Sequence, residues 1–134
     1  MHIELCVQKS FGIVYTKVYD INYKEIIPLK FKKIVLYGAG KRGRKFYDVI
    51  SELNTSSIVA WIDKGKAGQQ ICGYQLINPE DVKKIEFDAI LITVKDPIVV
   101  NEIIEDLSQM VSRDRIIWID LYTKEIWNRH ISFD

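Results

Sequence analysis

Residues 32–43 read Lys32-Lys33-Ile34-Val35-Leu36-Tyr37-Gly38-Ala39-Gly40-Lys41-Arg42-Gly43. A short apolar strand here runs directly into the pattern Gly-x-Gly-x-x-Gly. The first glycine allows a sharp turn out of the strand, the second lets the backbone approach a pyrophosphate, and the third lets the next helix lie close to the strand. Backbone N–H groups at the start of that helix would point toward the anion. The stretch therefore predicts a site for the phosphates of a nucleotide.

A second apolar run ends in a carboxylate: Ile58-Val59-Ala60-Trp61-Ile62-Asp63. Asp63 follows Gly43 by 20 positions, which fits the ribose-binding carboxylate of a dinucleotide fold. Two interpretations stay open, because Asp63 either accepts hydrogen bonds from ribose hydroxyls or is a polar residue that ends a strand. Ribose binding would repel a 2′-phosphate and favour NAD over NADP, although Lys64 and Lys66 soften that preference.

Composition limits the classes of protein to consider. With 134 residues, 48% of them hydrophobic, and a net charge of +1, the chain fits one domain with a sizeable core and has no bulk attraction for nucleic acid. No apolar run approaches the roughly 20 residues that span a bilayer, and the N-terminus lacks the features of a signal peptide, so we expect a cytoplasmic protein. Cys6 and Cys72 lack Cys-x-x-Cys spacing and are predicted to be reduced, packed thiols.

Apolar periodicity alternates strands with helices from residue 31 onward. The predicted strands are 33–37, 58–62, 74–77, 87–94 and 116–119. The predicted helices are 41–53, a helix capped by Asn78 with Pro79 at its first position, an apolar stripe from Val100 to Val111, and 121–127. This alternation predicts a Rossmann-like α/β domain, a doubly wound parallel sheet of about five strands.

Ligands in such sheets bind at the carboxyl ends of the strands where the winding reverses. That places the site beside the glycine loop and across from the loop after strand 87–94, with Lys95, Asp96 and Pro97 on its rim. The predicted cofactor-binding residues are Gly38, Ala39, Gly40, Lys41, Arg42, Gly43, Asp63, Lys64, Thr93, Val94 and Lys95.

Basic residues crowd the start of the first helix, where the helix dipole ordinarily favours acidic side chains. An anionic ligand would reconcile these charges with the dipole, and Arg42 is then the best candidate for direct contact with a phosphate. The alternative is a solvated basic face. The four residues are Lys41, Arg42, Arg44 and Lys45.

Residues 1–30 form an N-terminal extension ahead of the predicted nucleotide-binding domain, residues 31–134. Within it, Ile3–Val7 and Gly12–Tyr19 are predicted strands of a hairpin. Two interpretations stay open. The hairpin adds an edge to the sheet, or it is part of an element that packs against another chain or domain.

The order of these motifs resembles a known family. It is similar to the Rossmann-like domain that precedes the catalytic part of bacterial nucleoside-diphosphate-sugar epimerases and dehydratases, and to modules appended to glycosyltransferases and methyltransferases of surface-polysaccharide synthesis. The resemblance covers roughly residues 31–120 and implies a module that binds a nucleotide or sugar nucleotide. Two departures are that the chain stops where such proteins usually continue into a catalytic domain, and that residues 1–30 have no counterpart. The residues that carry it are Ile34–Gly43, Val59–Lys64, Ile71-Cys72-Gly73-Tyr74 and Asn78-Pro79-Glu80-Asp81.

No catalytic or metal-ligating constellation is predicted. Tyr37 and Lys41 have the spacing of the short-chain dehydrogenase pair, but they straddle the glycine turn and we discard the match. No Ser/His/Asp grouping and no metal-ligand spacing occurs. Trp61 and Trp118 fall inside predicted strands and are expected in the core rather than as stacking platforms.

Three functions remain open. The first is a module that holds NAD or a nucleoside-diphosphate sugar for a catalytic domain or enzyme partner, and that is not catalytic alone. The second is a fragment of an NAD-dependent sugar-nucleotide oxidoreductase or epimerase. The third is a protein-interaction module that has lost its ligand. A homodimer is a further hypothesis, in which Phe11, Trp127 and Phe133 are exposed anchors; the alternative is that these residues belong to the core.

Overall fold

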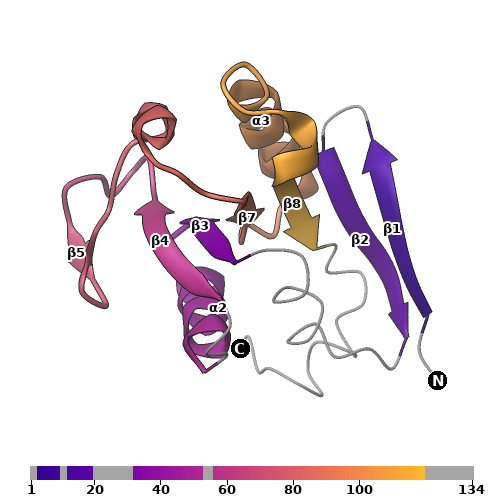
Figure 1. Cartoon of the computed structure of the whole chain (residues 1–134), viewed down its shortest axis with the longest axis horizontal. Coiled ribbons are helices and arrows are strands. Elements are labelled where there is room, and N and C mark those ends of the chain that lie inside the picture. Colours follow the sequence, from indigo (N-terminus) through magenta and orange to yellow (C-terminus); the bar gives the residue numbers. More distant parts are fainter. Residues whose placement is uncertain (1–2, 10–11, 20–31, 53–55, 120–134) are drawn as a thin grey trace.

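The computed structural model describes residues 3–9, 12–19, 32–52 and 56–119. A six-stranded sheet with the order β1-β2-β8-β7-β3-β4 dominates the fold (Figure 1). Strands β4, β3, β7 and β8 are parallel, β2 joins parallel to β8, and β1 is antiparallel to β2 at the edge. The strand bounds are β1 Ile3–Lys9, β2 Gly12–Tyr19, β3 Lys33–Tyr37, β4 Ser57–Ile62, β7 Ala89–Ile92 and β8 Ile116–Ile119.

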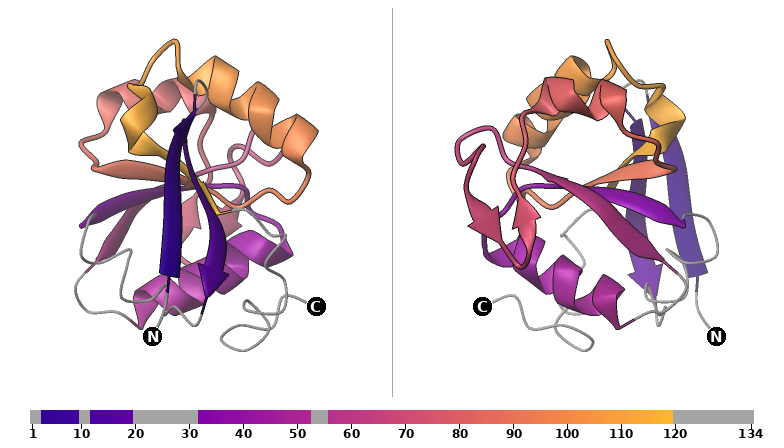
Figure 2. Two further views of the ribbon diagram at one scale, coloured as in Figure 1. Left: turned by 90° about the vertical axis from the view of Figure 1, so that its right-hand side faces the viewer. Right: turned by 60° about the vertical axis from the view of Figure 1, so that its left-hand side comes forward.

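Helices cover both faces of this sheet. Helix α2 (Lys41–Ser51) packs on one face, whereas the 3-10 helix η1 (Pro79–Lys84) and α3 (Pro97–Leu107) pack on the other (Figure 2). A short 3-10 turn, η2 (Arg113–Arg115), leads into β8. The winding reverses between β3 and β7, since β3 is followed along the chain by its neighbour β4 and β7 by its neighbour β8. The prediction of a Rossmann-like doubly wound sheet is confirmed.

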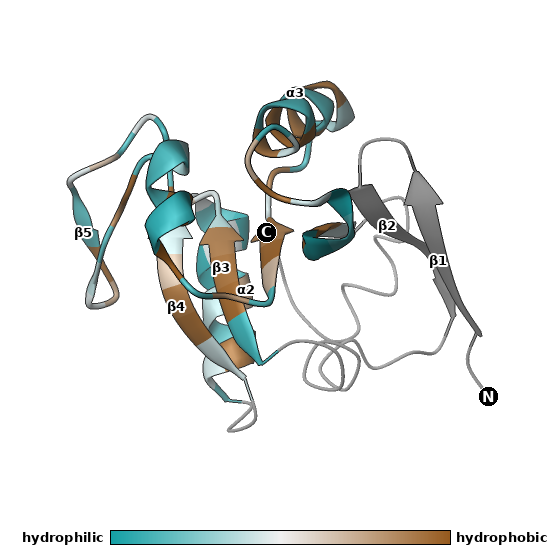
Figure 3. Cartoon of the chain, turned by 45° about the horizontal axis from the view of Figure 1, so that its top comes forward, coloured by the Kyte–Doolittle hydropathy of each residue, from teal (hydrophilic) through white to brown (hydrophobic). Residues whose placement is uncertain are grey.

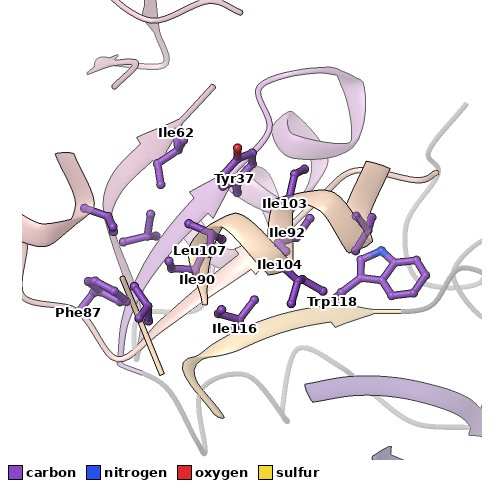
Figure 4. Packing of buried hydrophobic residues seen from close by; sticks show 14 of the residues in the cluster. Tyr37, Ile62, Phe87, Ile90, Ile92, Ile103, Ile104, Leu107, Ile116 and Trp118 are labelled. Atoms are coloured by element: carbon purple, nitrogen blue, oxygen red, sulfur yellow. The ribbon is translucent and has the colours of Figure 1, made fainter. Parts of the chain in front are cut away.

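The central strands are buried on both faces, as their unbroken apolar sequences predict. The last four residues of β3 and all four of β7 are buried. Figure 3 shows β3 and β4 as hydrophobic over most of their length. One core cluster joins the sheet to α2, and the other joins it to η1 and α3 (Figure 4). Trp61 and Trp118 are buried in these clusters, so their predicted core role is confirmed.

The predicted strand 74–77 is wrong in its placement. Residues Tyr74–Gln75 (β6) pair with Gln70–Ile71 (β5) in a separate antiparallel hairpin, and only Ile77 reaches the main sheet, through a single parallel bridge to Ile62. Two residues with positive φ, Cys72 (+48°) and Gly73 (+85°), close this hairpin. The tight turn sends the segment back along β5 before it can extend along β4, so the hairpin replaces a strand of the sheet.

Cys72 also corrects the prediction of two packed thiols, because it is exposed at the tip of that hairpin. Positive φ at both central residues is the type I′ geometry, which favours Asn-Gly and penalises other side chains at the first position. Cys72→Asn is therefore expected to raise the free energy of unfolding by about 0.5–1 kcal/mol. Urea denaturation measures the gain. Cys72→Ala, which removes the thiol but keeps the unfavourable φ, should give none, and equal gains in the two variants would contradict the explanation.

The N-terminal hairpin adds an edge to the sheet, as the first interpretation of residues 1–30 predicts. Packing of this segment against another chain or domain stays a prediction. Strands β1 and β2 pair antiparallel, from Lys9 opposite Gly12 to Ile3 opposite Tyr19. Strand β2 continues the sheet beyond β8, with Ile13 opposite Ile117. The division of the chain into domains at residue 30 stays a prediction. The predicted helix 121–127 and the residues Phe11, Trp127 and Phe133 lie outside the described residues.

Asp88 anchors the start of the central strand. Its carboxylate oxygen Oδ2 accepts hydrogen bonds from the backbone N–H groups of Lys32 and Lys33, both at 2.8 Å. These two bonds hold the pKa of the Asp88 carboxyl below its ordinary value of 3.8, and the bond from Lys33 has the larger effect. The folded state is therefore favoured when Asp88 is ionised.

The lowered pKa of Asp88 predicts a pH dependence of stability. Its contribution is fully present above the unfolded pKa, and it is lost over the acidic window in which the pH falls from the ordinary value of 3.8 through the lower, folded pKa. Asp88→Asn removes this titration, so we expect its free energy of unfolding to fall less steeply across that window than that of the wild type. Urea titrations at several pH values measure both curves, and parallel curves would contradict the prediction.

Candidate functional site

The glycine loop connects β3 to α2 and starts with a sharp turn. Gly38 has φ +111°, a conformation that side chains rarely adopt, and its N–H donates to the carbonyl of Ile62 at 2.8 Å. The Gly38 carbonyl accepts from Trp61 Nε1 at 2.8 Å and from the hydroxyl of Thr93 at 3.2 Å. Groups from β4 and from the end of β7 thus fix the first turn of the loop.

The other two glycines differ in their surroundings. A Cβ on Gly43 would lie 2.0 Å from the carbonyl oxygen of Gly38, so only glycine lets α2 approach the strand this closely. A Cβ on Gly40 would meet nothing within 4 Å. Gly40 is the N-cap of α2, and no side chain caps the helix there. The start of the helix is therefore open to an approaching group, and its first N–H groups lack partners within the helix.

Asp63 ties the glycine loop to the loop that follows β4. Its Oδ2 accepts from the backbone N–H of Ala39 at 2.8 Å. Its Oδ1 accepts from the N–H groups of Gly65 at 3.1 Å and Lys66 at 3.2 Å. A carboxylate offers about four lone-pair positions, so three are in use. One position on Oδ2 remains for a ligand.

The end of β7 closes the other side of the loop. Thr93 is buried, and its single hydroxyl hydrogen is shared between the carbonyl of Gly38 and the carbonyl of Tyr37, which lies at 2.9 Å. The carbonyl of Val94 accepts from Trp118 Nε1 at 3.0 Å. Asp96 caps α3, because its Oδ1 accepts from the N–H of Ile98 at 2.9 Å. The structure thus places Thr93 against the glycine loop as predicted, and gives Asp96 the role of a helix cap.

A cleft of about 280 Å³ opens beside Gly38, between the ends of β3 and β4 and one side of α3. Four of the predicted site residues line it: Gly38, Asp63, Lys64 and Val94. Lys95 is exposed and does not line it, and Lys41, Arg42 and Gly43 belong to the α2 side of the loop. The remaining lining residues are Tyr37, Gly65, Val99, Glu102, Ile103 and Asp106.

The two sides of the glycine loop carry opposite charges. The first turn of α2 contains Lys41, Arg42 and Arg44 and no acidic residue. The cleft on the α3 side is lined by the carboxylates of Asp63, Glu102 and Asp106 and by one cation, Lys64. A ligand with an anionic group at α2 and an uncharged group in the cleft would match this distribution.

Comparison with known proteins places the chain in a family. Residues 30–117 match the family described as C2185-like, N-terminal. The chain belongs to the C2185-like family. The match runs from the entry into β3 to β8 and excludes the hairpin β1-β2. A search among curated proteins gives no match.

Among solved structures, the C2185-like chain is similar to the UDP-D-quinovosamine 4-dehydrogenase from Vibrio fischeri. The TM-score is 0.60 at 20% sequence identity, over 76% of this chain and 88% of that chain. At this identity the likeness concerns the fold, and it agrees with the Rossmann-like sheet described above.

Several residues of the C2185-like site were missed by sequence reasoning. Lys66 Nζ donates to the carbonyl of Ala39 at 3.3 Å, and Trp61 holds Gly38 through its ring nitrogen. Glu102 and Asp106 reach the cleft from α3. One signal was available for these two, because Glu102 directly precedes Ile103 and Asp106 directly precedes Leu107, and Ile103 and Leu107 are positions of the predicted apolar stripe. Nothing in the sequence indicated the roles of Lys66 and Trp61.

The described residues of the C2185-like chain contain neither a membrane-spanning helix nor a cluster of metal ligands. None of their helices has the length and apolar character needed to cross a bilayer. No three of their His, Cys, Asp or Glu side chains gather closely enough to hold a metal ion.

Proposed function

We propose that the chain binds a nucleotide, either a nucleoside-diphosphate sugar or NAD, with its diphosphate over the glycine loop at the start of α2. The observation that carries this proposal is the contrast between Gly40 and Gly43. Gly43 is needed for packing, but Gly40 borders open space in which a Cβ meets no protein atom. Glycine at an unobstructed N-cap leaves room for a ligand to approach the backbone.

The charges at the start of α2 support the same placement. Helix N-termini bind anions through N–H groups that lack partners within the helix, and the helix dipole adds to this attraction. Lys41 and Arg42 in the first turn would complement a diphosphate. On the other side of the loop, Asp63 retains one lone-pair position, enough for one ribose hydroxyl and not for a pair bound at two positions.

The choice of sugar nucleotide or NAD rests on the family resemblance and on the name of the similar structure, a UDP-D-quinovosamine 4-dehydrogenase. In this proposal the chain serves surface-polysaccharide synthesis by holding the nucleotide for a catalytic domain or an enzyme partner. An NAD-dependent oxidoreductase fragment is the second candidate, because the similar structure is named a dehydrogenase.

The test is a titration of the purified chain with NAD, NADP, UDP-glucose and CDP-glucose, in which the melting temperature is measured at each ligand concentration. Saturation at 100 times the dissociation constant adds roughly 2.7 kcal/mol, which should raise melting by several degrees. Gly40→Leu fills the open space above the loop and should abolish the shift while the chain stays folded. Lys83→Leu adds the same side chain to an exposed position of η1 and should keep the shift.

Each outcome separates the candidates. A shift with NAD alone agrees with the oxidoreductase fragment and with the NAD form of the binding module, whereas a shift with one sugar nucleotide favours the binding module and identifies the base of its ligand. An equal shift in wild type and Gly40→Leu would overturn the placement of the diphosphate. The absence of any shift in a cooperatively folding wild type would favour a protein-interaction module.

A further inference from the structure

Tyr37 buries a hydroxyl group without a partner. The residue is 8% exposed, and its ring belongs to the core cluster under η1 and α3. Figure 4 shows its oxygen on the side away from Ile90 and Leu107. Within the described part of the chain, no hydrogen bond reaches the Tyr37 hydroxyl. Burial of an unpaired polar group is unfavourable, so such a group in a cleft wall points to a bound partner.

Three carboxylates line the same cleft as this hydroxyl. Tyr37 lines the cleft together with Asp63, Glu102 and Asp106. Burial raises the pKa of the Tyr37 phenol, and the negative charges of Asp106, Asp63 and Glu80 raise it further. The phenol therefore stays protonated at neutral pH and both donates and accepts. The carboxylates only accept, so, apart from the Lys64 ammonium, the charged groups of the wall match hydrogen-bond donors on its occupant.

We propose that this cleft holds an uncharged ring of the ligand that carries hydroxyl or amino donors, and that it excludes an anionic ring. The proposal rests on the nucleotide-binding function and adds the chemistry of the second half of the site. At about 280 Å³ the cleft suits one ring rather than a whole dinucleotide. Since Tyr37 directly precedes Gly38, one ligand spans the cleft and the phosphate loop. The ring is either a ribose or the sugar of a sugar nucleotide.

The first test is Tyr37→Phe, which removes one oxygen and keeps the ring in the core. Calorimetric titration should show affinity about threefold to tenfold lower, the value of one neutral hydrogen bond. Without ligand, the variant should melt at or above the wild-type temperature, because it no longer buries an unpaired hydroxyl. Tyr47→Phe is the matched control, since Tyr47 packs against Trp61 on the α2 face, away from the cleft. Unchanged affinity in Tyr37→Phe would overturn the proposal.

The second test compares nucleotides that differ in one charged group. In the pair NAD and NADP, the group is a phosphate on a ribose, and in the pair UDP-glucose and UDP-glucuronic acid it is a carboxylate on the sugar. In one of the two pairs, the wild type should bind the member that lacks this group about tenfold more tightly, because like charges repel in the cleft. Glu102→Gln combined with Asp106→Asn should reduce that ratio severalfold, and the affected pair identifies the ring in the cleft. Glu105→Gln, on the same helix but outside the cleft wall, should leave the ratio unchanged.

The outcomes distinguish this inference from the proposed function. If the wild type binds none of NAD, NADP, UDP-glucose, CDP-glucose and UDP-glucuronic acid, both the proposed function and this inference are overturned. Binding that Gly40→Leu abolishes, but that the Tyr37 variant and the Glu102/Asp106 double variant leave unchanged, overturns the cleft assignment alone.

Discussion

Gly43→Ala is expected to lower the free energy of unfolding by about 3 kcal/mol or more, because the new methyl group overlaps backbone. Its Cβ would lie 2.0 Å from the carbonyl oxygen and 3.0 Å from the carbonyl carbon of Gly38. A backbone atom cannot move aside as a flexible side chain does. Either α2 shifts away from the sheet, or Gly38 moves and loses its bonds from Trp61 and Thr93.

Thermal denaturation measures this effect, with a fall in melting temperature of more than about 10 °C. Gly40→Ala is the matched control in the same loop. It adds the same methyl group to open space and should cost at most about 1 kcal/mol through a poorer helix cap. Similar melting temperatures for the two variants would show that α2 does not need this close approach.

Asp63→Asn is expected to be the second most damaging change, with a loss of about 2–3 kcal/mol. The carboxylate accepts from three backbone N–H groups, one on Oδ2 and two on Oδ1. An asparagine has one oxygen and one NH₂ group, so its NH₂ would face at least one backbone donor. The link between the glycine loop and the loop after β4 would then be broken on one side.

Asp96→Asn is the control for Asp63→Asn, because it makes the same chemical change at a single-acceptor site. Asp96 caps α3 through one bond to Ile98, and asparagine caps helices about as well as aspartate. We expect a loss of no more than about 0.5 kcal/mol at this site. Urea denaturation of both variants measures the difference. Equal losses would show that the three hydrogen bonds of Asp63 contribute no more to the free energy of unfolding than the single bond of Asp96.

The sequence predicted the parallel core well because its signals are local. The apolar runs of β3, β4 and β8 and the three-glycine loop identify strands and their order in βαβ units without any knowledge of partners. The pairing of Tyr74–Gln75 could not be predicted from such local signals. Whether these residues extend β4 or fold back depends on the turn at Cys72 and Gly73, and a cysteine is not a recognised signal for a type I′ turn.

The candidate site was predicted in part for the same reason. Glycine spacing identified the loop, and the structure brings Gly38, Ala39, Asp63 and Thr93 together as expected. Their role in binding stays a prediction. The internal hydrogen bonds of Asp63 and the unpaired hydroxyl of Tyr37 are products of three-dimensional packing, because each depends on groups from other segments. Sequence spacing therefore located the site without showing what its groups already bind.

The placement of β2 beside β8 has a consequence for synthesis on the ribosome. Ile13 lies opposite Ile117 in this pair, so β2 leaves the ribosome about 100 residues before the strand that it joins. Contacts that close so long a loop form slowly. Until β8 emerges, β7 presents an unpaired edge and the hairpin β1-β2 has no strand to join. During this period the nascent chain is most exposed to association with neighbouring chains.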